Sequence, residues 1–361
     1  MMYNQRSAFL KSLIAPLFEA MEDFSLSQVR PELKKIFSQD CLVHMCFPFN
    51  DMQGSDAFYT NCLEKLNTAV PDLERRNLIV LAATTEHGNE WVSTMGNYLG
   101  TFQEKFLDIL PTGHLMHMRF HEFFKFEDGN ITEVQAIWDI PELMMISNSW
   151  PLAPQLGKFI LTPSPETNDG IFVSGDGAKN EQKIKNMLTD LCRHPENPDP
   201  RVMNLDLHWH PNFNWYGPAG IGTCRGIDGF RNWHQIPFLR GMPNRKVDKS
   251  SDKFSDWEAH THWISEGDFV SETGWPNMIM KLTNDGWMGI PPVNKEILLR
   301  SLDFWRIGKD GRIKENWVLV DLLDMYNQIG VNVFDRMREF NKAKISRSVS
   351  YTHLRAHETN V

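Results

Sequence analysis

GSDAF at residues 54–58 returns as GIDGF at residues 226–230, and DGNI at 128–131 returns as DGRI at 310–313. In both copies a Glu follows the Ile by two residues and an Asp follows it by eight, so Asp139 in the first copy corresponds to Asp321 in the second. Landmarks in the same order at near-constant spacing indicate that the chain contains one fold twice. A duplicated fold predicts two equivalent pockets in one polypeptide.

Composition restricts the class of protein. A length of 361 residues predicts two or three domains, and 41% hydrophobic with 23% charged residues is typical of a soluble globular protein. The net charge of −9 argues against a nucleic-acid partner. The sequence has neither an apolar run of membrane-spanning length nor an N-terminal signal segment, so we expect no membrane partner and a cytoplasmic location. The five cysteines include no C-x-x-C pair and are expected to be reduced and packed.

The order of elements predicts an α+β fold. The spacing of apolar residues predicts helices near 9–24 and 28–37, a strand over 41–49 and a helix over 54–68 entered through Ser55 or Asp56 as the cap. Strands are then predicted at 77–84, 90–101, 114–126 and 131–138. Since no helix separates these later strands, they are expected to form an antiparallel sheet.

The second copy repeats this order and sets the domain boundaries. It predicts helices at 180–194, 226–239 and 331–343, and strands at 212–217, 254–264, 268–281, 295–307 and 313–320. We therefore expect domain 1 at residues 1–150, a linker rich in Pro and Gly at 151–178 and domain 2 at 179–344. Residues 345–361 resemble translated sequencing-adapter read-through and are set aside as a non-native tail.

IKENWVLVDLLDMYNQIG at residues 313–330, with WYGP at 215–218 and the following Arg225, Gly226 and Phe230, resembles the SnoaL-like polyketide cyclase family. The resemblance covers most of residues 180–340 and, more weakly, 8–148. It implies the nuclear-transport-factor-2-like fold, so the prediction is two tandem cone-shaped α+β barrels, each a curved antiparallel sheet wrapped by about three helices. In this family an aspartate of the closing segment is the acid/base of an aldol cyclisation. Carried over by motif, that residue is Asp321, with Asp139 as its repeat equivalent.

Asp321 follows the apolar strand residues 318–320, so its carboxylate is expected to meet a dry cavity that raises its pKa toward neutrality. His234, on the predicted pocket helix, is the second catalytic candidate because an imidazole can polarise a carbonyl or relay a proton. Each has a structural alternative. Asp321 and Asp139 can cap the helices that follow them, and His234 can be a surface or core histidine.

The candidates for substrate binding come from the strand at 212–217 and its neighbours. Asn214 and Tyr216 share one face and could hold an oxyanion, whereas Trp215 takes the other face, and packing is the alternative for Trp215 and Tyr216. Further candidates are Arg225, Phe230, Arg300 and Trp317, and in domain 1 His44, Phe58 and Arg119.

A charged pair recurs in both copies. Arg300 and Asp303 match Arg119 and Glu122, and a spacing of three places the two members on opposite strand faces. One member could therefore point inward in each copy, although a solvated cross-strand ladder is the alternative.

The histidine pairs His208-x-His210 and His260-x-His262 have a spacing used for metal ligation. No third-ligand motif accompanies them, and the family resemblance implies no metal, so we expect neither a metal nor another cofactor.

These residues predict a cofactor-independent acid/base enzyme acting on a small or medium apolar carbonyl compound. The alternative is a non-catalytic binding or carrier protein that uses the same apolar cone. A third interpretation assigns catalysis to one copy and a structural role to the other. The expected partner is a small-molecule substrate, and the tandem copies are expected to form a pseudo-dimer within the chain, with a homodimer of chains as a further expectation.

Overall fold

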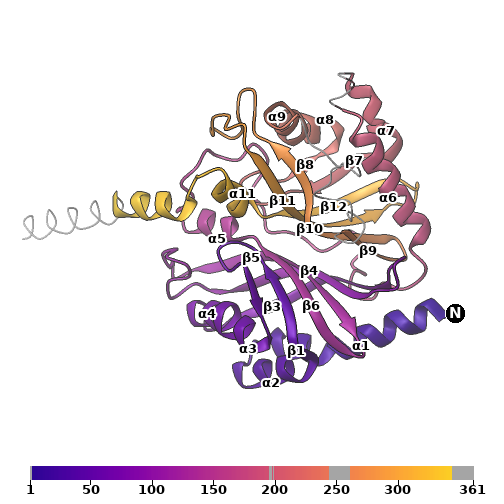
Figure 1. Cartoon of the computed structure of the whole chain (residues 1–361), viewed down its shortest axis with the longest axis vertical. Coiled ribbons are helices and arrows are strands. Elements are labelled where there is room, and N and C mark those ends of the chain that lie inside the picture. Colours follow the sequence, from indigo (N-terminus) through magenta and orange to yellow (C-terminus); the bar gives the residue numbers. More distant parts are fainter. Residues whose placement is uncertain (1, 195–196, 198, 244–260, 344–361) are drawn as a thin grey trace, which may run out of the picture.

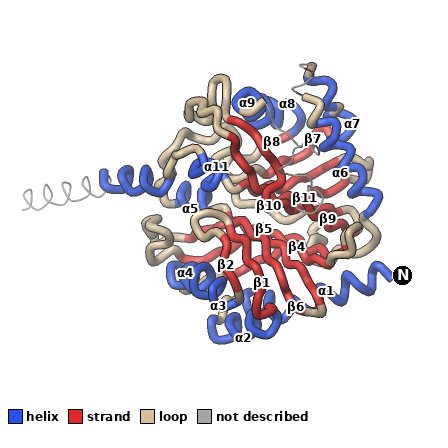
Figure 2. The backbone as a smooth tube through the Cα atoms, in the orientation of Figure 1, coloured by secondary structure: helices blue, strands red, loops and turns tan. Residues whose placement is uncertain are grey.

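A computed structural model describes residues 2–194, 197, 199–243 and 261–343. Two six-stranded sheets of the same design form its frame (Figures 1 and 2). The strands follow the order β2-β1-β6-β5-β4-β3 in the first half and β8-β7-β12-β11-β10-β9 in the second. In each half the first strand pairs in parallel with the last strand, and the other pairings are antiparallel. The predicted class, two tandem cone-shaped α+β barrels, is confirmed.

The first half begins with two helices and closes its sheet with one short helix. Its elements are α1 Met2–Glu22, α2 Leu26–Ile36, β1 Phe37–Met45, β2 Asp51–Gln53, α3 Ser55–Phe58, the π-helix η1 Tyr59–Leu63, α4 Glu64–Ala69, β3 Glu74–Thr84, β4 Glu90–Thr101, β5 Leu115–Glu127, β6 Asn130–Trp138 and α5 Ile140–Ile146.

The second half repeats this order after an irregular stretch that spans most of 147–177. Its elements are α6 Ala178–Leu191, the 3-10 helix η2 Pro200–Met203, α7 Leu205–His208, β7 Trp209–Tyr216, β8 Cys224–Arg225, α8 Gly226–Phe230, the π-helix η3 Arg231–Gln235, α9 Ile236–Gly241, β9 Thr261–Glu266, β10 Phe269–Lys281, β11 Glu296–Ile307, β12 Ile313–Val320 and α11 Leu322–Gln328. Residues 333–343 are also helical. The predicted tail at 345–361 and the start of the strand predicted at 254–264 lie outside the described residues.

The repeated glycines of the sequence have a backbone cause. Gly54 has φ 80° and Gly226 has φ 67°, and Gly129 and Gly311 in the later hairpins have φ 81° and 79°. A side chain is strained in this region, so glycine is favoured at the same turns in both copies. The predicted cap is wrong for this reason: Gly54, and neither Ser55 nor Asp56, is the N-cap residue of α3.

The two sheets pack against each other, and the helices α2, α3 and α4 lie on the outer side of one half while α8 and α9 lie on the outer side of the other (Figure 1). Ser93 of β4 and Ser271 of β10 meet at the junction with their hydroxyl oxygens 2.7 Å apart. They occupy equivalent strand positions, because each is the neighbour of the residue that pairs with Glu122 or Asp303. The junction therefore brings equivalent positions of the two sheets together. Among the described residues, no helix is long and apolar enough to cross a membrane.

Candidate functional site

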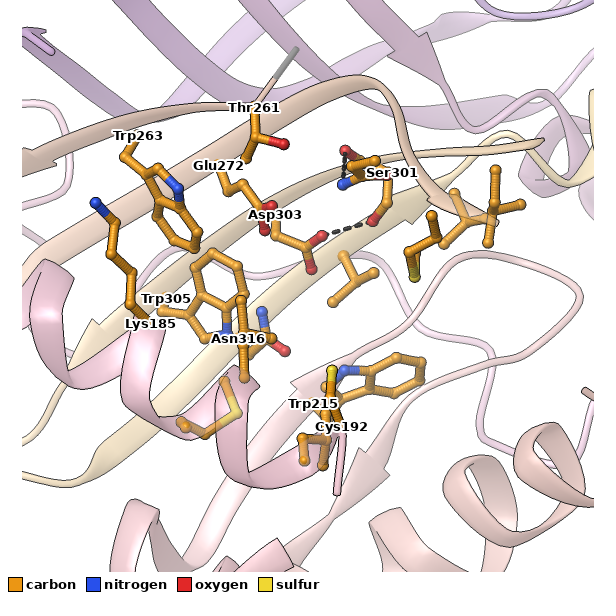
Figure 3. Close-up of a pocket in the computed structure, with 18 of the residues that line it drawn as sticks. Lys185, Cys192, Trp215, Thr261, Trp263, Glu272, Ser301, Asp303, Trp305 and Asn316 are labelled. Atoms are coloured by element: carbon orange, nitrogen blue, oxygen red, sulfur yellow. Dashed lines mark hydrogen bonds between the residues drawn. The ribbon is translucent and has the colours of Figure 1, made fainter. Parts of the chain in front are cut away.

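The second half encloses a cavity of about 670 Å³ between its sheet and its helices (Figure 3). The walls come from α6, β7, the α8–η3–α9 helix, β9, β10, β11, β12 and the start of α11. Glu86 and His87, in the β3–β4 turn of the first half, also contribute. A cavity of this volume is suited to a drug-sized molecule.

Alternate side chains of the strands line the cavity. Leu299, Ser301, Asp303 and Trp305 of β11 line the cavity, as do residues 316, 318 and 320 of β12. Successive side chains in a strand point to opposite faces, so each second residue enters the cavity. The intervening residues face the junction with the first half.

Two carboxylates lie opposite each other in this lining. Glu272 of β10 pairs in register with Asp303 of β11, and their exposed fractions are 7% and 8%. The Ser301 hydroxyl donates a hydrogen bond to Asp303 Oδ2 at 2.5 Å, which fixes the orientation of that carboxylate (Figure 3). Carboxylates placed in a largely apolar cavity are suited to proton transfer.

Amide and hydroxyl groups stand beside the carboxylates. Asn277 Nδ2 donates to the Ser301 carbonyl at 3.1 Å, and Asn316 Nδ2 donates to the Phe304 carbonyl at 2.9 Å. Asn277 Oδ1 and Thr261 Oγ1 are buried without a hydrogen-bond partner among the described residues. Buried polar atoms usually have a partner, so these two are available to a bound molecule.

His234 lies in this cavity, together with Trp215 and Phe230. It belongs to the π-helix η3, which recurs in the first half as η1, and π-turns are frequent at functional sites. Its ring stacks on Trp215 with centroids 4.1 Å apart and an interplanar angle of 15°. The structure thus brings three of the candidates predicted from the sequence to one cavity.

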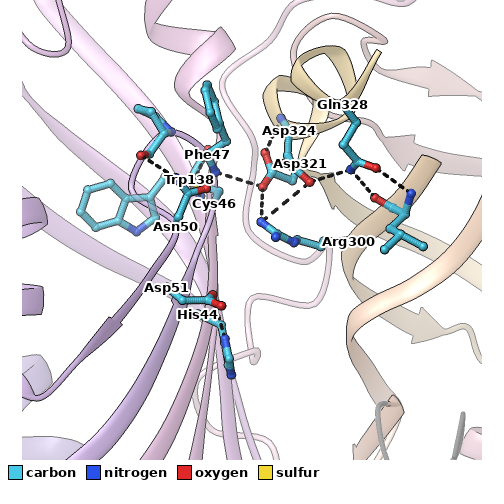
Figure 4. A network of polar contacts seen from close by, with 12 residues as sticks. His44, Cys46, Phe47, Asn50, Asp51, Trp138, Arg300, Asp321, Asp324 and Gln328 are labelled. Atoms are coloured by element: carbon cyan, nitrogen blue, oxygen red, sulfur yellow. Dashed lines mark hydrogen bonds and ion pairs between the residues drawn. The ribbon is translucent and has the colours of Figure 1, made fainter. Parts of the chain in front are cut away.

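Asp321 lies elsewhere. It is absent from the cavity lining and is buried at the junction between the halves (Figure 4). Its carboxylate accepts hydrogen bonds from the Phe47 N–H of the first half at 3.0 Å and from Asp324 N at 3.1 Å, and Arg300 Nη1 lies 3.3 Å away. The expectation that it meets the pocket is wrong, because Val318 and Val320 take the cavity face of β12 and Asp321 follows on the opposite face. It is the N-cap of α11, as the structural alternative predicted.

Asp139 repeats this arrangement from the other side. It is buried, lies at the N-cap of α5, accepts a hydrogen bond from Ala219 N of the second half at 2.9 Å and lies 3.4 Å from Arg119 Nη2. Arg119 itself donates to the Tyr216 and Gly217 carbonyls at 2.8 Å each. Each half therefore has a buried aspartate that accepts a hydrogen bond from a backbone N–H of the other half. Arg119 adds two hydrogen bonds across the junction, whereas the half-buried Arg300 pairs with Asp321 of its own half.

Burial is the main cause of the raised pKa values of Asp321 and Asp139. Desolvation, with the nearby charge of Asp324, raises the pKa of Asp321 from an ordinary 3.8 to about 7. Desolvation and the charge of Glu142 also raise the pKa of Asp139. The predicted direction of the shift is thus found at Asp321, although its surroundings are the junction and not the cavity.

Asp321→Asn is expected to flatten the dependence of stability on pH. Between pH about 4 and 7 the folded chain holds a proton on Asp321 that the unfolded chain has lost, so the free energy of unfolding falls as pH rises. The contribution is fully present below the unfolded pKa and is lost above pH about 7, a change of roughly 4 kcal/mol at most. Urea unfolding at pH 5 and pH 8 measures it. Equal pH dependence in the variant and the unchanged chain would contradict the assignment.

The remaining candidates of the second half lie outside the cavity. Asn214 Nδ2 donates to the Tyr216 hydroxyl at 3.1 Å, which confirms that they share a strand face, but that face is opposite to Trp215 and the cavity. Trp317 stacks on Tyr216 there, and Arg225 is exposed and donates to Asn214 Oδ1. The predicted oxyanion role of Asn214 and Tyr216 is therefore corrected: the apolar Trp215 faces inward.

The other candidates of the first half contact neighbouring residues and do not line the cavity. His44 Nδ1 lies 2.9 Å from Asp51 Oδ1, and Phe58 stacks on Phe37 in the core. His208 is the last residue of α7 and lies 2.8 Å from Asp190 Oδ2, so it does not share a strand face with His210. His260 lies outside the described residues, and those that are described contain no group of three His, Cys, Asp or Glu arranged for a metal.

The interior of the first cone is filled. Glu122, which corresponds to Asp303, lies 2.8 Å from Arg75 Nη1 and accepts hydrogen bonds from the Tyr98 hydroxyl and from Trp138 Nε1. The side chain of Arg75 is fully buried and that of Glu122 is 2% exposed. Side chains thus occupy the part of the first cone that corresponds to the carboxylate end of the cavity.

Sequence reasoning missed much of the polar lining of the cavity. It named Asp303 only as one of a pair, and it did not name Glu272, Ser301, Asn277 or Asn316. Polar residues within two otherwise apolar strands, Ser301 and Asp303 two positions apart on one and Asn316 on the next, were the signal that could have found them.

The comparisons with known proteins agree with this architecture. Residues 16–145 match the family model described as SnoaL-like polyketide cyclase. The match therefore falls on the first half of the chain. The match falls on the copy in which the resemblance was expected to be weaker, and the second half repeats the sheet order of the SnoaL-like half. No curated protein matches the chain in sequence.

Similar solved structures each correspond to one half of this chain in length. AclR of Streptomyces galilaeus, named as a candidate hydroxylase, is 21% identical with a TM-score of 0.33, covering 39% of this chain and 96% of AclR. IdmH of Streptomyces antibioticus, named as a candidate polyketide cyclase, is 19% identical with a TM-score of 0.32, covering 38% of this chain and 96% of IdmH.

Proposed function

We propose that the protein is an acid/base enzyme that acts on a small or medium, largely apolar carbonyl compound in the cavity of its second half. The observation that carries the proposal is the pair of carboxylates, Glu272 and Asp303, set in register inside an aromatic cavity of about 670 Å³. The family whose model matches the first half and the name of IdmH support a cyclase-type reaction, such as an intramolecular aldol closure.

In this proposal Asp303 is the base. Its carboxylate, oriented by the Ser301 hydroxyl, removes a proton from the carbon next to the carbonyl. The electron pair of that C–H bond forms the C=C bond of the enolate, and the π pair of the carbonyl moves to its oxygen. A hydrogen-bond donor such as the Thr261 hydroxyl stabilises the developing enolate oxygen. The enolate carbon then attacks a second carbonyl of the same molecule, and the protonated carboxyl returns its proton to the new alkoxide.

The aromatic walls position the substrate. Trp215, stacked with His234, and Trp305 offer flat apolar surfaces on which an extended carbonyl compound can lie. A ring closure requires its two reacting carbons to be held close together, and a bound, folded substrate meets that requirement. We assign His234 to this orienting role beside the carboxylates.

We place the chemistry in the second half and a structural role in the first. The equivalent interior of the first half is occupied by Arg75 against Glu122, which leaves its carboxylate already bonded to a cation. In this proposal Asp321 and Asp139 hold the two halves together through their hydrogen bonds across the junction.

Proton exchange tests the proposal without knowledge of the natural substrate. The chain is incubated in D₂O with a panel of aromatic 1,3-diketones and methyl ketones, and deuterium at the carbon next to the carbonyl is followed by NMR. Exchange above the buffer rate that disappears when the cavity is blocked by Ser301→Trp is the expected result. Compounds that bind without any exchange would contradict the enzyme and favour the carrier protein.

A further inference from the structure

A bulge in β10 brings an asparagine side chain onto the face of the sheet that lines the cavity. Gly274 pairs with Ser301 of β11. The ladder resumes with the pair of Met278 and Leu299, so four steps along β10 match two along β11. Asn277 lies in this bulge, and a Cβ atom at position 274 would overlap its Cβ. The Asn277 side chain therefore lies over the backbone of Gly274 and lines the cavity.

The first half has no such bulge at the equivalent point. In the register that the two sheets share, Gly96 of β4 is the equivalent of Gly274. From Glu90 to Thr101 the pairing of β4 with β5 continues without a shift. The bulge is thus a feature of the half that has the cavity, and bulges next to active sites commonly change the direction in which a side chain points.

The Asn277 amide has one fixed orientation. Its Nδ2 donates a hydrogen bond to the Ser301 carbonyl at 3.1 Å. The reverse orientation would place two oxygens that only accept hydrogen bonds against each other, so Oδ1 points away from the strand backbone. Asn277 is 4% exposed, and its Oδ1 has no hydrogen-bond partner among the described residues. Buried acceptors usually have a partner, so a bound molecule can supply the missing donor.

The Asn277 oxygen is remote from the proposed base. Ser301, to which the amide is bonded, and Asp303 are two residues apart on β11, which corresponds to about 7 Å along the strand. A carbonyl compound with its acidic carbon at Asp303 can therefore reach Asn277 with a group several bonds away. An amide oxygen is satisfied only by a hydrogen-bond donor, and a hydroxyl is a donor that carries no charge.

We propose that the substrate carries a hydroxyl group on its apolar frame, remote from the reacting carbonyl, and that this hydroxyl donates a hydrogen bond to Asn277 Oδ1. The inference rests on the proposed function for the location of the site and deepens it by naming a group that the substrate has. Asn277 is then a specificity-determining residue. A site that bonds a hydroxyl discriminates against an analogue without it, because the buried acceptor stays unpaired.

Three methyl ketones of similar shape test this requirement. The ring substituent of para-hydroxyacetophenone donates and accepts, that of para-methoxyacetophenone only accepts, and that of para-methylacetophenone does neither. Each is titrated into the full chain by calorimetry. The hydroxyl compound is expected to bind about tenfold more tightly than the other two. Because this series uses the unchanged chain, its result is independent of the folding of any variant.

Asn277→Leu replaces the amide with an apolar side chain of similar size. It should remove the preference for the hydroxyl compound and leave binding of para-methylacetophenone as tight or tighter. The matched control is Asn97→Leu in the first half. Asn97 is 4% exposed, donates to the Thr162 carbonyl at 2.9 Å and has a buried Oδ1 without a partner among the described residues, but it does not line the cavity. Its loss should leave the preference intact.

Equal binding of the three compounds by the unchanged chain overturns the inference. A preference that survives in Asn277→Leu, or that Asn316→Leu removes instead, overturns the assignment to Asn277. The proposed function is judged separately by deuterium exchange at the methyl carbon next to the carbonyl of the same three compounds. Exchange without a preference for the hydroxyl compound would leave the acid/base enzyme standing and remove only its selectivity for a hydroxyl.

Discussion

Asp303→Asn is expected to lower turnover of a neutral carbonyl substrate by about 100- to 10,000-fold, the usual contribution of a positioned acid or base. Asn keeps an oxygen that can accept the hydrogen bond from Ser301, so the side chain keeps its place while it loses its basicity. The measurement is the initial rate on whichever compound shows exchange, with circular dichroism to verify folding.

Asp321→Asn is the matched control for this experiment. Asp321 is a second buried aspartate, but it follows the end of β12 and faces Phe47 and Arg300 at the junction and not the cavity. We expect its rate to stay near that of the unchanged chain at a pH where both are folded. A large loss in Asp321→Asn with a normal rate in Asp303→Asn would place the catalytic carboxylate at the junction.

Arg75→Met is expected to lower the free energy of unfolding by about 3–5 kcal/mol. The substitution keeps most of the apolar stem but leaves the Glu122 carboxylate buried beside aromatic rings without its cation. Removing one partner of a buried ion pair costs more than the pair contributes, because the remaining charge stays out of water. Urea unfolding monitored by tryptophan fluorescence measures the loss.

The next residue along the strand supplies the control. Arg76 forms an ion pair with Glu74 in which both side chains are largely exposed, at 61% and 43%. Arg76→Met should therefore change stability by no more than about 1 kcal/mol. The double variant Arg75→Met with Glu122→Gln should recover part of the loss, and a double variant as unstable as Arg75→Met would argue against an unpaired charge as the cause.

The sequence was sufficient to predict the architecture. The repeated Gly54 and Gly226, and the hairpin glycines 129 and 311, lie at turns whose backbone geometry favours glycine. Their spacing therefore predicted how the elements of one copy correspond to those of the other. Strand alternation also showed that one member of each pair, Arg119 with Glu122 and Arg300 with Asp303, could point inward, with a solvated ladder as the alternative.

The direction of Asp321 could not be predicted in the same way. Alternation separates residues 316, 318 and 320 from residues 317, 319 and 321, but it does not say which set faces the cavity. In a strand with one face exposed to solvent, the polar side chains identify the outer face and the apolar side chains the inner face. Here both faces of β12 are buried, one in the cone and one at the junction, so the two sets look alike in the sequence. The same ambiguity misplaced Asn214 and Tyr216.

The filled first cone has a consequence for how such a molecule can evolve. In an assembly of identical subunits, a substitution that introduced an arginine such as Arg75 would appear in every subunit and close every cone at once. A gene that encodes both copies in tandem escapes this constraint. The cone of one domain can be filled with side chains and become rigid, while the other domain keeps an open cavity. Such a molecule should saturate at one ligand for each polypeptide, however symmetric its frame.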